Sequence, residues 1–124
     1  MPTLADVENI REAIATVKAR LVIIDPIMAY LGSKDGHKDQ DVRSITHPVA
    51  HLAEETGVAV VLVRHLNKSE KASPLYRGGG SIGIAGAARS VLLVAPDRDD
   101  PTLRILASVK SNLSAPAPAL RLKP

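Results

Sequence analysis

The sequence predicts an α/β fold of one domain over residues 1–124, with a mainly parallel sheet flanked by helices and an antiparallel C-terminal hairpin. Two apolar runs, 21–24 and 58–63, lack the polar alternation of half-exposed strands, which is typical of strands buried on both faces of a parallel sheet. Amphipathic segments precede both runs, as expected of helices that cover such a sheet. Two further apolar runs, 91–95 and 103–109, flank an Asp/Pro turn and predict the hairpin.

The first helix is predicted from apolar residues at helical spacing: Leu4, Val7, Ile10, Ile14 and Val17. Thr3, followed by Asp6, is expected to cap its start. The strand of residues 21–24 follows and ends at Asp25-Pro26. Because proline cannot continue a strand ladder and holds the preceding residue extended, the Asp25 carboxylate is expected at the carboxyl tip of this strand.

The second helix is predicted from an apolar stripe that a glycine ends: Val42, Ile45, Val49, Leu52 and Gly57. Pro48 lies inside the stripe and is expected to kink the helix or to shift its start. The strand of residues 58–63 then leads to His65. Working groups of parallel sheets gather beyond the carboxyl ends of the strands, so Asp25 and His65 are expected at the same edge.

The remaining segments are predicted to be loops, a short helix and a tail. Residues 31–41 and 67–80 are polar and contain glycines, which is typical of loops. A short helix is expected over residues 81–88. The tail, residues 115–124, is rich in proline and is expected to add an edge strand at 120–122.

Composition excludes several classes of function. The chain has no Cys, which excludes disulfide scaffolds, thiolate zinc sites and cysteine nucleophiles. Its only aromatic residues are Tyr30 and Tyr76, which argues against an aromatic platform for stacking bases. The net charge of +3 is compatible with polyanions without indicating them. No apolar run is long enough to span a membrane and no signal peptide is evident, so we expect a soluble, cytoplasmic chain without membrane contacts.

Four hydrophobic residues followed by Asp25 have the form of a Walker B strand. That chemistry needs a carboxylate fixed at a strand tip to hold the water shell of a phosphate-bound Mg²⁺. An aspartate also ends many strands simply as a turn former. Both interpretations stay open on this motif alone.

Two other motifs are weaker. Residues 78–83 match G-x-G-x-x-G, but no strand precedes them and too little helix follows for a dinucleotide site. The same glycines nearly satisfy the phosphate loop G-x-x-x-x-G-K, except that Ile84 replaces the lysine. His47 and His51 lie four residues apart and suit a metal, but Pro48 between them and the lack of an evident third ligand favour two solvated histidines.

Four segments together resemble the C-terminal half of RecA-like P-loop ATPases. The nearest branch is that of the RepA-like hexameric replicative helicases and the AAA-type ATPases found beside phage and plasmid primases. The resemblance covers nearly the whole chain in the correct order and rests on the segments LVIIDPIMAYLG, VVLVRHLNKS, YRGGGSIGIAGAARSVLLV and ILASVKSNLSAPAPAL.

The resemblance implies a role for individual residues. Asp25 would be the Walker B carboxylate that holds Mg²⁺ of ATP through water, and His65 the polar sensor of the γ-phosphate. Arg89 would be the arginine finger that reaches a neighbour's nucleotide, and Lys110 a second cation acting in trans; an ion pair with Asp or Glu is the alternative for Arg89. The loops 31–41 and 67–80 would face a channel for single-stranded DNA in a self-associated ring. The cations that would contact it are Lys68, Lys71 and Arg77.

The chain also departs from the family. The family places a strand, the phosphate loop and its lysine before the Walker B strand, and this chain begins after them, so the resemblance implies a fragment or a degenerate paralogue that is inactive alone. A non-enzymatic module that lends Arg89 to a related ATPase is the alternative. In the family the missing strand lies between the strands at 58–63 and 91–95. We therefore expect one of two outcomes: the two strands pair directly, or the exposed edge of the strand at 58–63 pairs with another copy of the chain. We favour self-association.

Overall fold

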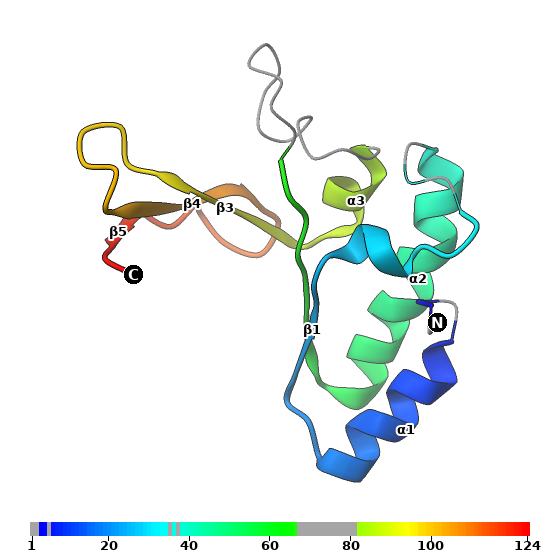
Figure 1. Cartoon of the computed structure of the whole chain (residues 1–124). Coiled ribbons are helices and arrows are strands. Elements are labelled where there is room, and N and C mark those ends of the chain that lie inside the picture. Colours follow the sequence, from blue (N-terminus) through cyan, green and yellow to red (C-terminus); the bar gives the residue numbers. More distant parts are fainter. Residues whose placement is uncertain (1–2, 5, 35, 37, 67–81) are drawn as a thin grey trace. The chain divides into compact units, whose positions relative to one another are not determined.

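The computed structural model describes residues 3–4, 6–34, 36, 38–66 and 82–124. They form two compact units, residues 1–87 and residues 88–124. Figure 1 labels most of the elements, which are divided between the two units as follows. The first unit contains α1 (Val7–Val17), β1 (Leu21–Ile24), the 3₁₀ helix η1 (Ile27–Tyr30), α2 (Asp39–Thr56), β2 (Ala59–Leu62) and α3 (Ile82–Ala87). The second contains β3 (Ser90–Pro96), β4 (Arg104–Ser111) and β5 (Leu120–Leu122). That the two units belong to one domain stays a prediction.

The predicted fold class is confirmed in both units. Strands β1 and β2 pair in parallel, from Leu21 opposite Ala59 to Ile24 opposite Leu62. Strand β4 pairs antiparallel with β3 and with β5, which gives the expected hairpin and its edge strand. The described helices belong to the same unit as the parallel strands, and the antiparallel strands come after them in the sequence.

The parallel ladder continues beyond the two strands and surrounds Asp25. The backbone N–H of Val63 donates to the oxygen of Ile24 at 2.8 Å, and the N–H of Ile27 donates to the oxygen of Val63 at 2.8 Å. The Asp25–Pro26 peptide between these two bonds is cis. Asp25 thus lies at the end of the ladder, between two residues, Ile24 and Ile27, that are both hydrogen-bonded to Val63.

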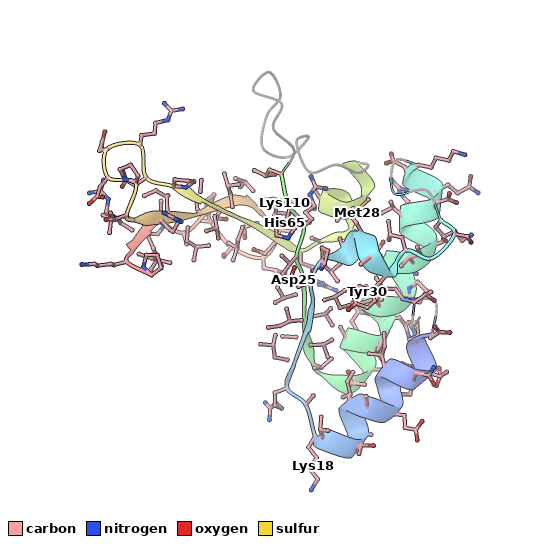
Figure 2. The ribbon with its side chains drawn as sticks, viewed as in Figure 1. Lys18, Asp25, Met28, Tyr30, His65 and Lys110 are labelled. Atoms are coloured by element: carbon pink, nitrogen blue, oxygen red, sulfur yellow. The ribbon has the colours of Figure 1, made fainter. Side chains whose placement is uncertain are left out.

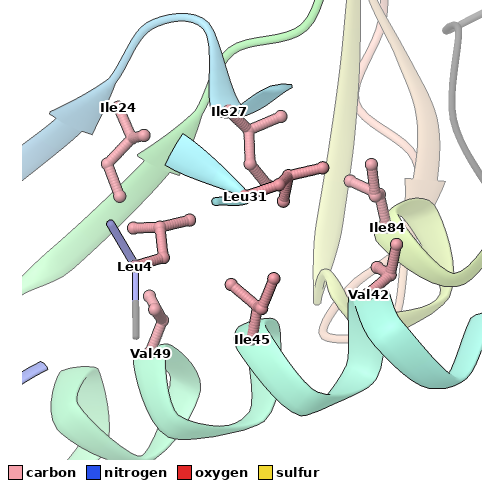
Figure 3. Close-up of a cluster of buried hydrophobic side chains, with 8 residues drawn as sticks. All are labelled: Leu4, Ile24, Ile27, Leu31, Val42, Ile45, Val49 and Ile84. Carbon is pink, nitrogen blue, oxygen red and sulfur yellow. The ribbon is translucent and has the colours of Figure 1, made fainter. Parts of the chain in front are cut away.

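One face of the β1–β2 sheet carries the core. Figure 1 shows α1 and α2 on the same side of β1. Figure 3 shows the larger of two buried clusters, which draws on the end of β1, the η1 segment, α2, α3 and the residue Leu4 before α1: Leu4, Ile24, Ile27, Leu31, Val42, Ile45, Val49 and Ile84. A second cluster, Ile14, Leu52 and Val58, joins α1 to α2. Burial of these aliphatic side chains holds the helices against the strands.

The prediction that both faces of the sheet are buried is wrong for the described structure. Leu21, Ile23 and Val61 are 50%, 59% and 44% exposed, whereas Ile24 is 7% exposed. Side chains alternate across a strand, so only every second residue points toward α1 and α2. An apolar run therefore shows that both faces of a strand are apolar, but it does not show that other elements pack against both of them.

The predicted cap of the first helix is wrong, because the hydrogen bonds between Thr3 and Asp6 do not involve the helix backbone. Asp6 is the N-cap residue of α1, and its side chain makes no hydrogen bond to the helix. Its carboxylate instead accepts hydrogen bonds from the backbone N–H of Thr3 at 2.9 Å and from the Thr3 hydroxyl at 3.1 Å. Leu4 precedes the helix, is 2% exposed, and donates its backbone N–H to the oxygen of Tyr30. The N-terminal stripe thus divides between a helix and a buried residue that anchors the chain next to η1.

Helix α2 continues across Pro48. It begins at Asp39, nine residues earlier, and ends at Thr56, where Gly57 adopts φ 69° and donates its N–H to the oxygen of Ala53. The expected shift of the start is therefore wrong, and the expected glycine stop is confirmed. A proline inside a helix removes one donor, while burial of the apolar stripe on both sides of it favours the helix. None of the helices in the described part of the chain is long and apolar enough to cross a membrane.

In the second unit, a buried carboxylate ties β5 to the turn between β3 and β4. The side chain of Asp97 is 4% exposed, and its Oδ2 lies 2.6 Å from Nε of Arg121 in β5. Its Oδ1 accepts the backbone N–H of Asp99 at 2.8 Å and that of Asp100 at 3.3 Å. Hydrogen bonds from the Asp99 and Asp100 amides, together with the Arg121 charge, hold the pKa of Asp97 below its ordinary value of 3.8.

This lowered pKa predicts a loss of stability in acid. A carboxylate whose pKa is lower in the folded state stabilises the fold above its unfolded pKa, and that contribution disappears as the pH falls through the folded value. We expect Asp97→Asn to lower the melting temperature of the chain at pH 6 and to lower it less at pH 2, because acid favours the protonated form of the native side chain. Thermal melts followed by circular dichroism at both pH values check this. A difference that does not shrink between pH 6 and pH 2 would count against a contribution from the charge of Asp97.

Candidate functional site

The structure brings Asp25 and His65 together at the carboxyl tips of the parallel strands. Asp25 directly follows β1, and His65 follows β2 after two intervening residues. Oδ1 of Asp25 lies 3.7 Å from Nε2 of His65, and the two side chains are 57% and 79% exposed. Figure 2 labels both residues on the ribbon. An exposed ion pair of this kind contributes little to the stability of the fold. The carboxyl edge of a parallel sheet is where such folds bind ligands, so the position of the pair makes it a candidate functional site.

The segment that follows Asp25 is anchored on two sides. Ile27 is fully buried and is bonded through its N–H to Val63, while the oxygen of Tyr30 accepts the N–H of Leu4. The 3₁₀ helix η1 thus fixes the backbone just beyond the carboxylate. This arrangement leaves the Asp25 carboxylate exposed to solvent next to a backbone segment that is held by hydrogen bonds.

The donor chemistry of this edge fits a hydrated magnesium ion. Magnesium prefers oxygen ligands, keeps several waters, and is bound in nucleotide sites by one or two carboxylates together with phosphate oxygens. Asp25 offers an exposed carboxylate of this type. Within the described residues, no group of three or more His, Asp or Glu side chains is placed to enclose a metal. A part for Asp25 in holding such a metal stays a prediction.

Arg64 is a neighbour that the sequence interpretation did not single out. It lies between the end of the ladder at Val63 and His65, and its side chain is half-buried. Burial lowers the pKa of Arg64, although a guanidinium stays protonated in proteins. A cation directly after an apolar strand, in the string VRH, is the only sequence signal that points to it.

Arg89 and Lys110 come together in the second unit. The Lys110 ammonium donates to the oxygen of Ala88 at 2.7 Å, next to Arg89. The N–H of Asn112 donates to the oxygen of Arg89 at 2.9 Å. The Arg89 side chain is exposed and that of Lys110 is half-buried. The sequence interpretation named both cations but not this contact between Lys110 and the backbone before Arg89.

The predicted nucleic-acid contacts are described only in part. Lys68, Lys71 and Arg77 lie outside the described residues. In the other predicted loop, Lys34 and Lys38 are exposed, and α2 begins immediately after Lys38. Their roles toward a nucleic acid stay predictions.

The two histidines of α2 face solvent, and His51 lies beside an ion pair that joins α1 to α2. His51 Nδ1 lies 3.4 Å from Oε2 of Glu55, which also accepts a hydrogen bond of 2.7 Å from Arg11 in α1. The Arg11 hydrogen bond is the main cause that keeps the pKa of Glu55 below its usual range. The ion pair of Arg11 with Glu55 connects the exposed surfaces of α1 and α2. Of the glycine-rich motif, Gly83 lies in α3, where its N–H donates to Oδ1 of Asp39 at 3.1 Å.

Comparisons with known proteins bear on the same residues. A family model described as an AAA domain matches residues 1–71, which include Asp25 and His65. No curated protein matches the chain. Among solved structures, the chain is similar to one described as an ATPase domain, with 14% identity and a TM-score of 0.71. The match covers 93% of this chain and 46% of that one, so the chain spans about half the length of the structure it matches.

Proposed function

Because the chain belongs to the AAA domain family and has a RecA-like ATPase fold, we propose that it supplies the magnesium and sensor side of an ATPase site. The observation that carries this proposal is the placement of Asp25 and His65 3.7 Å apart at the tips of adjacent parallel strands. The parent activity couples ATP hydrolysis to binding of, or movement along, single-stranded DNA. Lys68, Lys71 and Arg77 are the cations proposed to contact the DNA phosphates.

In this proposal each residue at the sheet edge has a separate task. Asp25 accepts hydrogen bonds from water molecules bound to Mg²⁺, which neutralises charge on the phosphate oxygens of ATP. His65 lies within reach of the same carboxylate and is the polar link between the terminal phosphate and the loop that follows β2. The anchored η1 segment keeps Asp25 in place, so little reorganisation is needed when the nucleotide arrives.

Arg89 is proposed to act on the nucleotide of a neighbouring subunit. A transferred phosphoryl group spreads negative charge over its oxygens, and a forked, permanently charged guanidinium is suited to stabilise it. The exposed side chain of Arg89 next to the hydrogen-bonded backbone at Ala88 supports this role. Its counterpart in the neighbour is the edge formed by Asp25 and His65.

The chain by itself is proposed to be inactive. Its 124 residues contain no G-x-x-x-x-G-K sequence, and the cradle of backbone N–H groups that binds the phosphates depends on that loop. The same observation favours a second candidate function, a non-enzymatic module that lends Arg89 to a related ATPase. Translation of the DNA upstream of Met1 discriminates the two. An in-frame strand with G-x-x-x-x-G-K-[ST] supports the enzyme, and an immediate stop codon without this motif supports the module.

Self-association is proposed to use the outer edge of β2. Hydrogen bonds from Ala59 to Arg20 and from Val63 to Ile24 show that alternate residues of this strand face β1. The backbone groups of Val60 and Leu62 therefore point the other way. Within the described part of the first unit, β2 pairs with β1. An apolar edge of this kind favours a strand from a second copy.

We expect the chain to sediment at micromolar concentration as a dimer or larger assembly, at no less than twice the 13.1 kDa of one chain. Val60→Pro removes an outward N–H and should shift the chain toward monomer, whereas Val60→Thr keeps this N–H and serves as the matched control. Sedimentation velocity measures both variants. A wild-type monomer of 13.1 kDa with protected amides over residues 58–63 would contradict this proposal.

A further inference from the structure

The backbone of Arg89 is held on both sides by the end of strand β4. The Lys110 ammonium donates 2.7 Å to the oxygen of Ala88, which belongs to the peptide group that leads into Arg89. The N–H of Asn112 donates 2.9 Å to the oxygen of Arg89, which belongs to the peptide group that leaves it. All of these residues lie in the second unit, where Val91 pairs with Lys110 and Ser90 with Ser111.

Holding both peptide groups restricts the two backbone dihedrals of Arg89. A residue has only φ and ψ as soft backbone dihedrals, so fixing the planes before and after it fixes the direction of its Cα–Cβ bond. The side chain of Arg89 is exposed, and it leaves the backbone in a direction that these two hydrogen bonds restrict. The ladder between β3 and β4 begins at Ser90 and carries the same restraint into the sheet.

Of the two hydrogen bonds, the one from Lys110 to Ala88 is the stronger. It joins a charged donor to a neutral carbonyl at 2.7 Å, at the short end of the range for charge-assisted hydrogen bonds. The Lys110 side chain is half-buried along β4, so its ammonium reaches Ala88 from a stem that packing restrains.

We propose that Lys110 is a positioning residue for Arg89, acting through the Ala88 carbonyl and not as a second cation on a neighbour's nucleotide. The use made of Arg89 rests on the function proposed above, whereas the restraint itself does not. If Lys110 contacted the phosphates directly, its loss would weaken catalysis whether or not Arg89 were present. Acting through Arg89, it has no effect once that arginine is removed.

The restraint is tested on the 124-residue chain by nuclear magnetic resonance. Lys110→Met removes the donor and keeps the aliphatic stem, and we expect about a tenfold faster hydrogen exchange of the Asn112 amide and greater mobility of the Arg89 Nε–H group. Lys110→Arg keeps a charged donor and should restore both signals. Lys123→Met, at the exposed C-terminal end, is the matched control and should leave both unchanged.

Unchanged Asn112 exchange and unchanged Arg89 mobility in Lys110→Met would overturn the proposal. If Lys110→Met unfolds the hairpin, Lys110→Gln shortens the side chain and removes its charge, so the charge-assisted hydrogen bond to Ala88 is lost in a polar side chain, and the same two signals are read there. A change in both signals supports the restraint, and no change overturns it. A merely structural lysine would alter the melting temperature without altering Arg89 Nε relaxation more than that of Arg98.

A double-mutant cycle then tests the route of action in the protein that carries this chain together with its phosphate loop. Lys110→Met is expected to lower kcat about tenfold with KM little changed, since small misplacements of a catalytic group have effects of this size. Added to Arg89→Ala, it should lower kcat no further. A further loss in the double variant would show that Lys110 acts directly. If Arg89→Ala alone has no effect, the proposed function fails while the spectroscopic result stands.

Discussion

Replacing Arg89 with alanine is expected to lower ATP turnover by about 10³-fold or more in the protein that carries this chain with its phosphate loop, and to leave ATP affinity nearly intact. An arginine supplied by a neighbour stabilises charge that develops in the transition state, so its loss affects kcat and not ground-state binding. The exposed side chain on a backbone held at Ala88 and Asn112 is suited to that task. Steady-state phosphate release and a nucleotide-binding titration measure the two quantities.

Two controls separate a catalytic from a structural Arg89. Arg98→Ala removes another exposed arginine of the same hairpin unit and should leave turnover unchanged. Mixing Arg89→Ala with a protein that has an intact Arg89 but a disabled phosphate loop should recover part of the activity, because each defective subunit supplies what the other lacks. Unfolding of Arg89→Ala, or no recovery on mixing, would count against an arginine acting in trans.

The chain by itself is expected to bind ATP–Mg²⁺ more weakly than about 1 mM, which is worth less than about 4 kcal/mol. Most of the affinity of such sites for triphosphates comes from the phosphate loop, whose backbone N–H groups and lysine contact the phosphates. The described site offers Asp25 and His65, and a single exposed carboxylate cannot replace that cradle. Isothermal titration calorimetry checks the affinity. Binding in the micromolar range that Asp25→Ala weakens would show that another part of the chain holds the phosphates.

The sheet edge was predictable because its determinants are local. Two apolar runs of strand length, each followed at once by polar residues, are enough to place Asp25 and His65 beyond the same ends of two parallel strands. The observed separation of 3.7 Å agrees with that expectation. The stop of α2 at Gly57 was predictable for the same reason, since a glycine with φ 69° is a local device.

Features that depend on contacts distant in sequence were not predictable. The 3₁₀ helix η1 is fixed by hydrogen bonds to Leu4 and Val63, which no pattern within residues 27–30 reveals. The exposed face at Ile23 depends on which packing partners are present, and an apolar run carries no information about them. The contact of Lys110 with Ala88 joins residues 22 positions apart, so the sequence shows the cation and not its acceptor.

Steady-state phosphate release from ATP–Mg²⁺ tests most directly whether Asp25 and His65 form only one side of an ATPase site. We predict no release above buffer background from the 124-residue chain alone. We predict release once a strand with G-x-x-x-x-G-K-[ST] is supplied upstream, and its loss on Asp25→Ala. Turnover by the chain alone that Asp25→Ala abolishes would contradict this view of the site.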